Sequence, residues 1–183
     1  SITVDSDLDD VEILDSSGRS ASVGSLAWEL AQKAGGSSGD DQSNAVAVDS
    51  NGDVYVTGAF EQTATFGSTT LTTAGNDDIF VAKMNSTGHW LWAVQAGGLY
   101  DDTGMDLAVD STGNVFLTGS FQNTAQFGSD SMTAGPASND DFFIAKIDTW
   151  GNWQWVEGVD CHNSGRCYGT SVAVDSTGYA YVT

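Results

Sequence analysis

The sequence predicts an all-β fold of tandem four-stranded antiparallel sheets, because one phrase recurs along the chain at nearly constant spacing. The three copies are AVDSNGDVYVTG at 47–58, AVDSTGNVFLTG at 108–119 and AVDSTGYAYVT at 173–183. Their equivalent residues Asp49, Asp110 and Asp175 are separated by 61 (110 − 49) and 65 (175 − 110) residues. Other phrases recur between them in the same order, so the chain contains about three units of 61–65 residues.

Within the first complete unit, four short stretches are rich in the β-branched and aromatic residues that favour strands. They are 44–49, 53–60, 78–85 and 90–96. The DSNG and NSTG between them are typical of tight hairpin turns, because an Asp or Asn side chain can bond the turn's own backbone and Gly accepts a positive φ. The recurring Asp is therefore expected to hold a turn and not to act in catalysis. Four antiparallel strands in each tandem unit predict the blades of a β-propeller.

The register of the repeat divides the chain into whole and partial blades. Residues 1–26 are an acidic segment or a degenerate half-blade, and residues 27–183 are the propeller repeats. The repeats comprise a half-blade at 27–36, two full units at about 43–98 and 104–158, and a half-blade at 170–183. In the N-terminal part, 11–18 is expected to be a third strand with its turn, 19–26 an insertion, and 27–36 the fourth strand.

The two partial blades predict self-association or a longer parent chain. Each would leave an open strand edge, which proteins normally cover. Pairing within one chain would give three blades, fewer than the usual minimum of four, so a small closed ring is the weaker alternative. The expected partner is therefore a further segment of a longer chain or a second copy, whose strands would extend the sheet into a ring or a fibre.

The repeated phrases resemble the β-propeller repeats known as SBBP repeats, which are found in secreted and cell-surface proteins of bacteria and archaea. The resemblance is carried by VAVDSNGDVYVTGAF, the FGS phrase, DIFVAKMNSTG and the WLW…GG ending, and it covers about residues 27–183. It implies an extracytoplasmic propeller. It names no reaction and supplies no functional residues to transfer to this chain.

The composition is strongly acidic and limits the expected partners. There are 25 Asp and Glu against 5 Lys and Arg, a formal net charge of −20 at pH 7. A field of this sign repels nucleic-acid phosphates and anionic lipids, so neither is an expected partner. No apolar run approaches the roughly 18–20 residues of a membrane helix. The charge suits divalent cations, high salt or a basic partner, or it serves solubility alone.

Calcium is the expected cofactor, and the best candidate site is DSDLDD at 5–10 with the acid that follows it. The ligands would be Asp5, Asp7, Asp9, Asp10 and Glu12. Alternating Asp residues begin a calcium loop, but Asp10 occupies the position where a standard twelve-residue loop needs Gly. A solvated acidic terminus is the alternative. Oxygens could also come from the acidic turns at 39–41, 100–106, 76–78 and 139–141.

Four tryptophans recur in pairs on the predicted fourth strands, Trp90 with Trp92 and Trp153 with Trp155. Because alternate residues of a strand share a face, each pair is expected on one face of its sheet. The natural place for such a stripe is between neighbouring blades. A carbohydrate-binding platform is the functional alternative.

Two lysines recur at one position, Lys83 and Lys146, in a chain with only five basic residues. Each is expected to pair with a carboxylate inside its own blade. Asn85 begins an Asn-Ser-Thr glycosylation sequon in a predicted surface turn.

The two cysteines, Cys161 and Cys167, lie close together in CHNSGRC. This spacing predicts a local disulfide and therefore an oxidising compartment. A zinc pair is the alternative, but the chain offers only His89 and His162 to complete such a site.

These features favour an extracellular or cell-surface structural or adhesive module, such as a subunit of a surface layer, appendage or filament. The alternative is a propeller that binds carbohydrate or another ligand, and a secreted hydrolase is the third class. The sequence has no phosphate-binding Gly loop and no dinucleotide fingerprint, and none of its many carboxylates stands out as a catalytic pair. We therefore expect no catalytic residue and no enzymatic activity.

Overall fold

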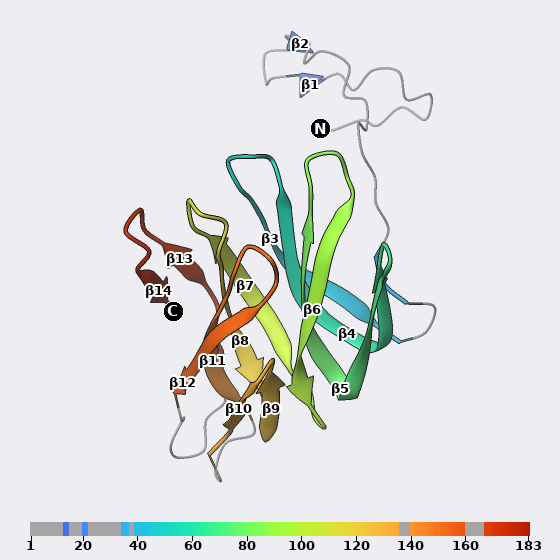
Figure 1. The fold of residues 1–183 in the computed structure, drawn as a ribbon, viewed down its shortest axis with the longest axis vertical. Helices are drawn as coiled ribbons and strands as arrows, with labels where there is room; N and C mark the ends of the chain where they lie inside the picture. Colours follow the sequence, from blue (N-terminus) through green and yellow to red (C-terminus); the bar gives the residue numbers. More distant parts are fainter. Residues whose placement is uncertain (1–12, 15–19, 22–33, 37–38, 136–139, 160–166) are drawn as a thin grey trace. The chain divides into compact units, whose positions relative to one another are not determined.

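The computed structural model describes residues 13–14, 20–21, 34–36, 39–135, 140–159 and 167–183 (Figure 1). Every regular element in these residues is a β-strand, which confirms the all-β prediction. The chain divides into two compact units, 1–32 and 33–183. The described residues include no helix long and apolar enough to cross a membrane.

The first unit contains one small hairpin. β1 (Ile13–Leu14) pairs antiparallel with β2 (Ser20–Ala21) in a two-stranded sheet of its own. The sequence predicts a third strand over 11–18 followed by an insertion at 19–26. The structure differs from this prediction, because β1 finds its partner inside that insertion.

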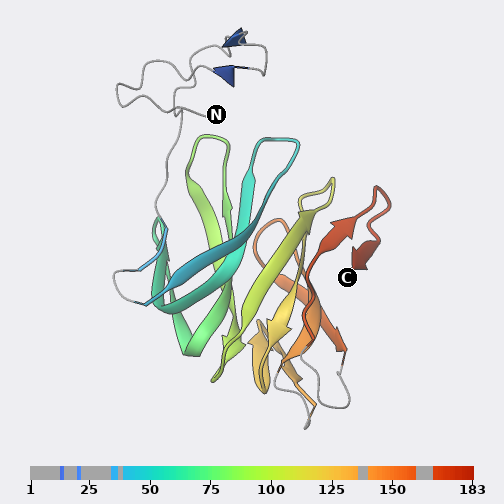
Figure 2. The same cartoon turned by 180° about the vertical axis from the view of Figure 1, so that it is seen from behind.

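The second unit contains two four-stranded blades and a two-stranded hairpin (Figure 2). The first blade consists of β3 (Asp41–Val48), β4 (Val54–Phe66), β5 (Thr69–Met84) and β6 (Trp90–Gly98). The second consists of β7 (Thr103–Val109), β8 (Val115–Phe121), β11 (Asp141–Ile147) and β12 (Trp153–Val159). β13 (Val172–Val174) and β14 (Ala180–Val182) pair as the first two strands of a third unit. These elements follow the predicted units closely.

Each blade also carries a hairpin arm that the sequence analysis does not predict. In the first blade β4 and β5 continue past a register shift after Glu61, where Gln62 has a φ of 60°. In the second the arm is separate, as β9 (Thr124–Phe127) and β10 (Asp130–Thr133), and follows Asn123 with a φ of 59°. The arm strand β9 pairs with β6 of the preceding blade, so it extends that blade's sheet to six strands.

The same arm contact recurs before the first blade. Gly35 forms an antiparallel bridge with Thr65, with both N–H···O distances 3.3 Å. Gly97 of β6 pairs in the same way with Gln126 of β9. Gly35 therefore occupies the place of a fourth-strand residue, whereas most of the predicted strand over 27–36 falls outside the described residues and stays a prediction.

Five hairpin turns share one hydrogen-bond pattern, which confirms the predicted role of the recurring Asp. In the first, Gly52 N donates to Asp49 O at 3.0 Å, and the Asp49 side chain accepts from the backbone N–H groups of Asn51 and Asp53. The Gly has a φ of 79°, which the left-handed position of such a turn requires. The other turns are headed by Asn85, Asp110, Asp148 and Asp175.

The main core lies between the two blades. One buried cluster contains side chains from both blades. It joins Tyr55, Ile79 and Val81 of the first blade to Phe143 of the second blade and Phe127 of its arm. The opposite face of the first blade has a separate cluster, in which Phe60, Phe80 and Ala82 pack against arm residues such as Phe66. Each sheet therefore buries apolar side chains on both faces.

The two tryptophans of each pair lie on opposite faces of their sheet, so the prediction that each pair shares one face is wrong. Trp90 pairs with Met84 and Trp92 with Lys83, because the register shifts by one residue there. Adjacent residues of β5 point to opposite faces, and their partners do the same. The second blade has the same shift between the partners of Trp153 and Trp155.

Each indole consequently has a different neighbour. Trp90 contacts Phe66 of its own arm at 5.2 Å between ring centroids, whereas Trp92 contacts Tyr55 at 6.2 Å. The Trp92 Nε1–H donates to the backbone oxygen of Thr149 in the second blade at 3.0 Å. This bond confirms the expected position between blades for Trp92.

The ion-pair prediction is confirmed for Lys83 and wrong for Lys146. Lys83 Nζ lies 3.0 Å from Asp53 Oδ2 and 4.0 Å from Asp49 Oδ2, and its side chain is 7% exposed. Burial opposes the charged form, but bonds to Tyr55 and Asp53 outweigh it and raise the pKa of Lys83.

The second blade has Asn114 at the position that Asp53 occupies in the first blade. Among the described residues no carboxylate lies within ion-pair distance of Lys146. Its ammonium instead lies 5.1 Å from the Phe116 ring centre.

The two lysines therefore provide a matched comparison. We expect Lys83→Met to lower the free energy of unfolding by about 3 kcal/mol, because it leaves Asp53, whose side chain is only 17% exposed, without its counter-charge. Lys146→Met should cost less than about 1 kcal/mol, because it loses only a cation–π contact. Urea unfolding followed by tryptophan fluorescence measures both, and equal losses would contradict the assignment.

Candidate functional site

The junction between the two blades is held by one buried carboxyl group, that of Asp102. This residue precedes β7 and has no exposed surface. Its backbone N–H donates to Asp77 O at 2.8 Å. Its carboxyl oxygens accept from Gly98 N at 2.7 Å and from Gln122 N at 2.9 Å. Asp102 thus joins the third and fourth strands of the first blade to the end of the second strand of the next.

A second buried carboxyl group, that of Asp78, lies at the same junction. Its Oδ2 accepts from Ala74 N at 2.9 Å and from Gln95 Nε2 at 3.4 Å. Its Oδ1 is buried and has no hydrogen-bond partner. Burial raises the pKa of Asp78 to about 6, and the neighbouring charge of Asp77 adds to the rise. Burial likewise raises the pKa of Asp102 to about 7, with Asp78 contributing.

Gly97 makes room for the two carboxyl groups. A Cβ at this position would lie 2.5 Å from Asp78 Oδ1 and 3.0 Å from Asp102 Oδ2. The two oxygens are therefore at most 5.5 Å apart, the sum of those distances. The φ of Gly97 is 151°, so a side chain here would be both crowded and strained.

The equivalent positions in the other units show which parts of this arrangement repeat. Asp41 occupies the place of Asp102 before the first blade, and its Oδ2 accepts from Gly36 N at 2.7 Å. After the second blade the place is taken by Cys167, whose N–H donates to Asp140 O at 3.2 Å. Asp141 is the buried counterpart of Asp78 and accepts from Gly135 N at 2.8 Å. The second junction therefore has a cysteine where the first has a second carboxylate.

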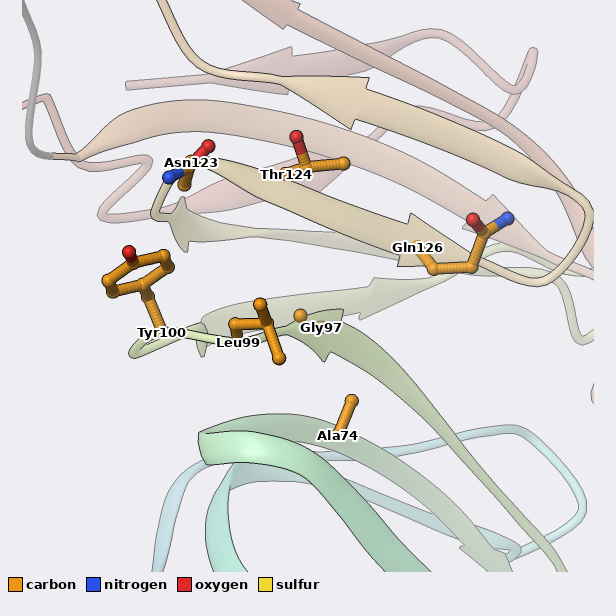
Figure 3. A pocket seen from close by; sticks show the side chains of 8 residues that line it. Ala74, Gly97, Leu99, Tyr100, Asn123, Thr124 and Gln126 are labelled. Carbon is orange, nitrogen blue, oxygen red and sulfur yellow. The ribbon is translucent and has the colours of Figure 1, made fainter.

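An open groove of about 470 Å³ runs along the same junction. Figure 3 shows Leu99 and Tyr100 on one side, Asn123 and Thr124 across from them, and Gln126 further along. Leu99 is 73% and Tyr100 46% exposed, although both are large apolar-bodied residues. The groove therefore offers an aromatic ring and amide side chains to a ligand.

An acidic pocket of about 380 Å³ is also formed by residues near this junction, among them Glu61, Asp77 and Asp101. Burial raises the pKa of Asp77, and the charges of Glu61, Asp101 and Asp40 raise it further. Asn76 Nδ2 donates to Asp101 Oδ1 at 2.9 Å. Two acidic segments that are separate in the sequence, at 76–78 within β5 and at 100–106 around the start of β7, thus meet in space. Within the described part of the chain, no three His, Cys, Asp or Glu side chains are grouped closely enough to hold a metal ion.

Several residues singled out from the sequence are not among those that the structure describes. Asp5, Asp7, Asp9, Asp10 and Glu12 fall outside the described residues, so the calcium loop stays a prediction. Cys161 also falls outside them, so its disulfide with Cys167 stays a prediction.

Asn85 and the four tryptophans do fall within the described residues. Asn85 heads a turn, where its Oδ1 accepts from His89 N at 2.9 Å, and its glycosylation stays a prediction. None of the four tryptophans is among the strongly exposed apolar residues, and their binding of glycans remains a prediction.

The junction itself has only weak signals in the sequence. The Asp-Asp pairs and the Gly-Gly that ends the fourth strand are visible in the repeat, but their meeting is not. Asp78 and Asp102 lie in different units, and only the strand pairing brings them to either side of Gly97.

Two comparisons with known proteins bear on the fold. Residues 31–59 and 91–120 match the family model described as SBBP, a β-propeller repeat. Over 128 residues the chain is 28% identical to an uncharacterized WD repeat-containing protein of Acanthamoeba polyphaga mimivirus. That alignment covers 64% of this chain and 9% of the viral protein, so this chain spans a small part of that relative's length.

The two buried carboxyl groups make stability depend on pH. With EDTA present, we expect the free energy of unfolding to fall as the pH rises from about 5 to 8. The folded state holds protons on Asp78 and Asp102 up to pH values of about 6 and 7, whereas unfolded Asp loses its proton near pH 3.8. The shift of Asp78 from 3.8 to about 6 corresponds to about 3 kcal/mol.

The turn aspartates act outside this pH window. Burial opposes ionisation of Asp49 and Asp110, but hydrogen bonds from the turn outweigh it and lower the pKa of both. Their contribution is present above about pH 4 and is lost only in stronger acid. Asp78→Asn should therefore flatten the decline between pH 5 and 8, whereas Asp130→Asn, at an exposed arm turn, should leave it unchanged. Urea unfolding at several pH values measures both, and parallel curves for all three proteins would contradict the assignment.

Proposed function

The chain carries β-propeller repeats of the SBBP family, and from that premise we propose that it is a structural or adhesive module outside the cell. In this proposal it assembles through its partial blades into a ring or filament, or completes a longer propeller. The proposed role is not catalytic, and it is supported by the descriptions of the matched family and of the viral relative, which name repeats and no reaction.

The observation that carries the proposal is the open edge of β14. Among the described residues β13 and β14 pair only with each other. The hydrogen-bonded pairs of this hairpin include Thr183 with Ser171 and Asp175 with Tyr179. Pairs alternate in an antiparallel hairpin, so the N–H of Val182 points to the open side. In the first blade the equivalent Val56 faces β5 and pairs with Ala82.

The other end supports a complementary contact. Gly35 takes the place of a fourth-strand residue beside the arm of the first blade. A fourth strand on one side, and a first and second on the other, would supply three of the four strands of one blade when joined. A contact of this kind is head-to-tail, and it closes into a ring or continues as a fibre.

Location outside the cell is the expectation that accompanies this role. It is supported by the resemblance to SBBP repeats, by the predicted disulfide and by the sequon at Asn85. The β13–β14 hairpin also has exposed aromatic side chains, Tyr179 at 69% and Tyr181 at 61%. They give its edge an apolar surface that a partner strand would cover.

Val182→Pro tests strand addition at this edge. Proline removes the outward N–H and leaves the β13–β14 bonds in place, so we expect particles larger than the 19.1 kDa chain to disappear. Val182→Thr keeps the N–H and should assemble like the unmodified protein. Light scattering coupled to size exclusion measures the mass, and circular dichroism checks the fold. Assembly by Val182→Pro would contradict the proposal, and a chain that stays monomeric leaves only a longer parent chain as the partner.

Ligand binding is the second candidate function, and the groove of Figure 3 is the observation that favours it. A half-exposed tyrosine beside amide side chains suits a sugar, which stacks on the ring and bonds the amides. Trp90 and Trp92 offer less of such a surface, because they pack against Phe66 and Tyr55.

A glycan screen tests this second function. We expect Tyr100→Ala to weaken binding of any glycan found by at least about tenfold, because the stacking ring is lost. Tyr179→Ala removes a more exposed ring outside the groove and should change nothing. Equal loss in both variants would contradict binding in the groove.

A further inference from the structure

We propose that the carboxylates of Asp78 and Asp102 bind a calcium ion between the first and second blades. The proposal is independent of how the chain assembles. Both residues are fully buried, and their facing oxygens lie at most 5.5 Å apart, the sum of their distances from a Cβ placed on Gly97. Two calcium–oxygen distances of about 2.6 Å span roughly 5.2 Å, so one ion between the groups contacts both after a shift of at most a few tenths of an ångström.

A second observation, beside the short distance between the two carboxylates, is that one carboxylate oxygen of Asp78 has no hydrogen-bond partner. Asp78 Oδ1 is buried without a hydrogen-bond partner, whereas Oδ2 is bonded to the backbone of Ala74. The two facing oxygens are Asp78 Oδ1 and Asp102 Oδ2, the same pair that closes around Gly97. A buried carboxylate oxygen without a donor is costly, and a cation on this side would satisfy it.

The lysines that the structure describes do not fill this role. The basic side chains within the described residues are those of Lys83 and Lys146. Lys83 is paired with Asp53, and Lys146 lies over Phe116. Neither described lysine therefore compensates the charge of this pair, and a proton or a bound ion would do so.

Calcium fits the donors better than other metals. The donors are oxygens only, which favours a hard cation. Calcium takes six to eight oxygens in flexible geometry, whereas magnesium requires near-ideal octahedral geometry. A cavity of about 330 Å³, lined by Asp78, Gln95 and Gly97 among others, lies beside Asp78 and has room for water ligands.

The site is specific to this junction. At the next junction Asp141 has the role of Asp78, but Cys167 replaces Asp102. One calcium ion per chain is therefore expected from this arrangement, and Asp141 supplies an internal control.

The test uses the full chain after treatment with EDTA. Isothermal titration with calcium chloride measures stoichiometry, and thermal unfolding measures the gain in Tm. We expect calcium to raise the Tm of the unmodified protein and of Asp141→Asn. Asp78→Asn should lose this gain, with calcium affinity at the junction reduced by at least about tenfold, because one of the two ligand charges is removed.

The same variant predicts a second effect. Its new amide nitrogen replaces the free oxygen and can donate to Asp102, so Asp78→Asn should be at least as stable as the unmodified protein in EDTA. No calcium gain in the unmodified protein, an equal gain in Asp78→Asn, or an equal gain with magnesium would each overturn the proposal.

Hydrogen exchange gives a measurement that needs no variant. The amides of Gly98 and Gln122 both donate to Asp102. Calcium bound at the junction should slow exchange at these two amides in the unmodified protein. Slowing confined to other parts of the chain would assign the ion to a different site and overturn the proposal.

Discussion

Each blade of this protein depends on its neighbour, because a four-stranded sheet with two apolar faces cannot bury both alone. The first blade covers one face with its own arm, through Phe66, and the other with the second blade, through Phe143. Burial of a Phe side chain contributes about 1.5–3 kcal/mol, so the contact between blades is a main source of stability. The arms, the indole of Trp92 and the carboxyl of Asp102 all serve this contact. Since the same face recurs in each unit, a blade at the edge of the array needs a further partner.

The aspartates of this chain behave differently in the hairpin turns and at the junction between the blades. In the turns, Asp side chains accept backbone N–H groups and are stabilised as anions, as the lowered pKa of Asp110 shows. At the junction, Asp78 and Asp102 are removed from water next to each other, and their pKa values rise. The same residue type therefore strengthens the hairpins at neutral pH and weakens the contact between blades unless a proton or cation is bound.

Divergence among the units shows which interactions the fold requires. The turn Asp is kept at 49, 110 and 175, and each side chain bonds the same two backbone positions. The residue four places later changes from Asp53 to Asn114 to Tyr179, and the ion pair with lysine disappears with it. The hydrogen bonds from the turn backbone to the Asp side chain are thus common to the units, whereas the lysine–aspartate ion pair is found in the first blade.

The sequence by itself determined the local structure, because local rules act within a few residues. The strand alternation, the Asp and Gly of the hairpin turns and the spacing of 61 and 65 residues predicted the blades and their order. These features depend on side chains that are close along the chain, so they can be recognised without coordinates.

Only the tertiary structure decided how those elements meet. The bulge that turns Trp90 and Trp92 to opposite faces depends on pairing with β5, and the arm strand β9 finds its partner in the preceding blade. The meeting of Asp78 and Asp102 depends on the same pairings. Such contacts join residues far apart in the chain, and a one-residue change in register reverses the face that a side chain occupies.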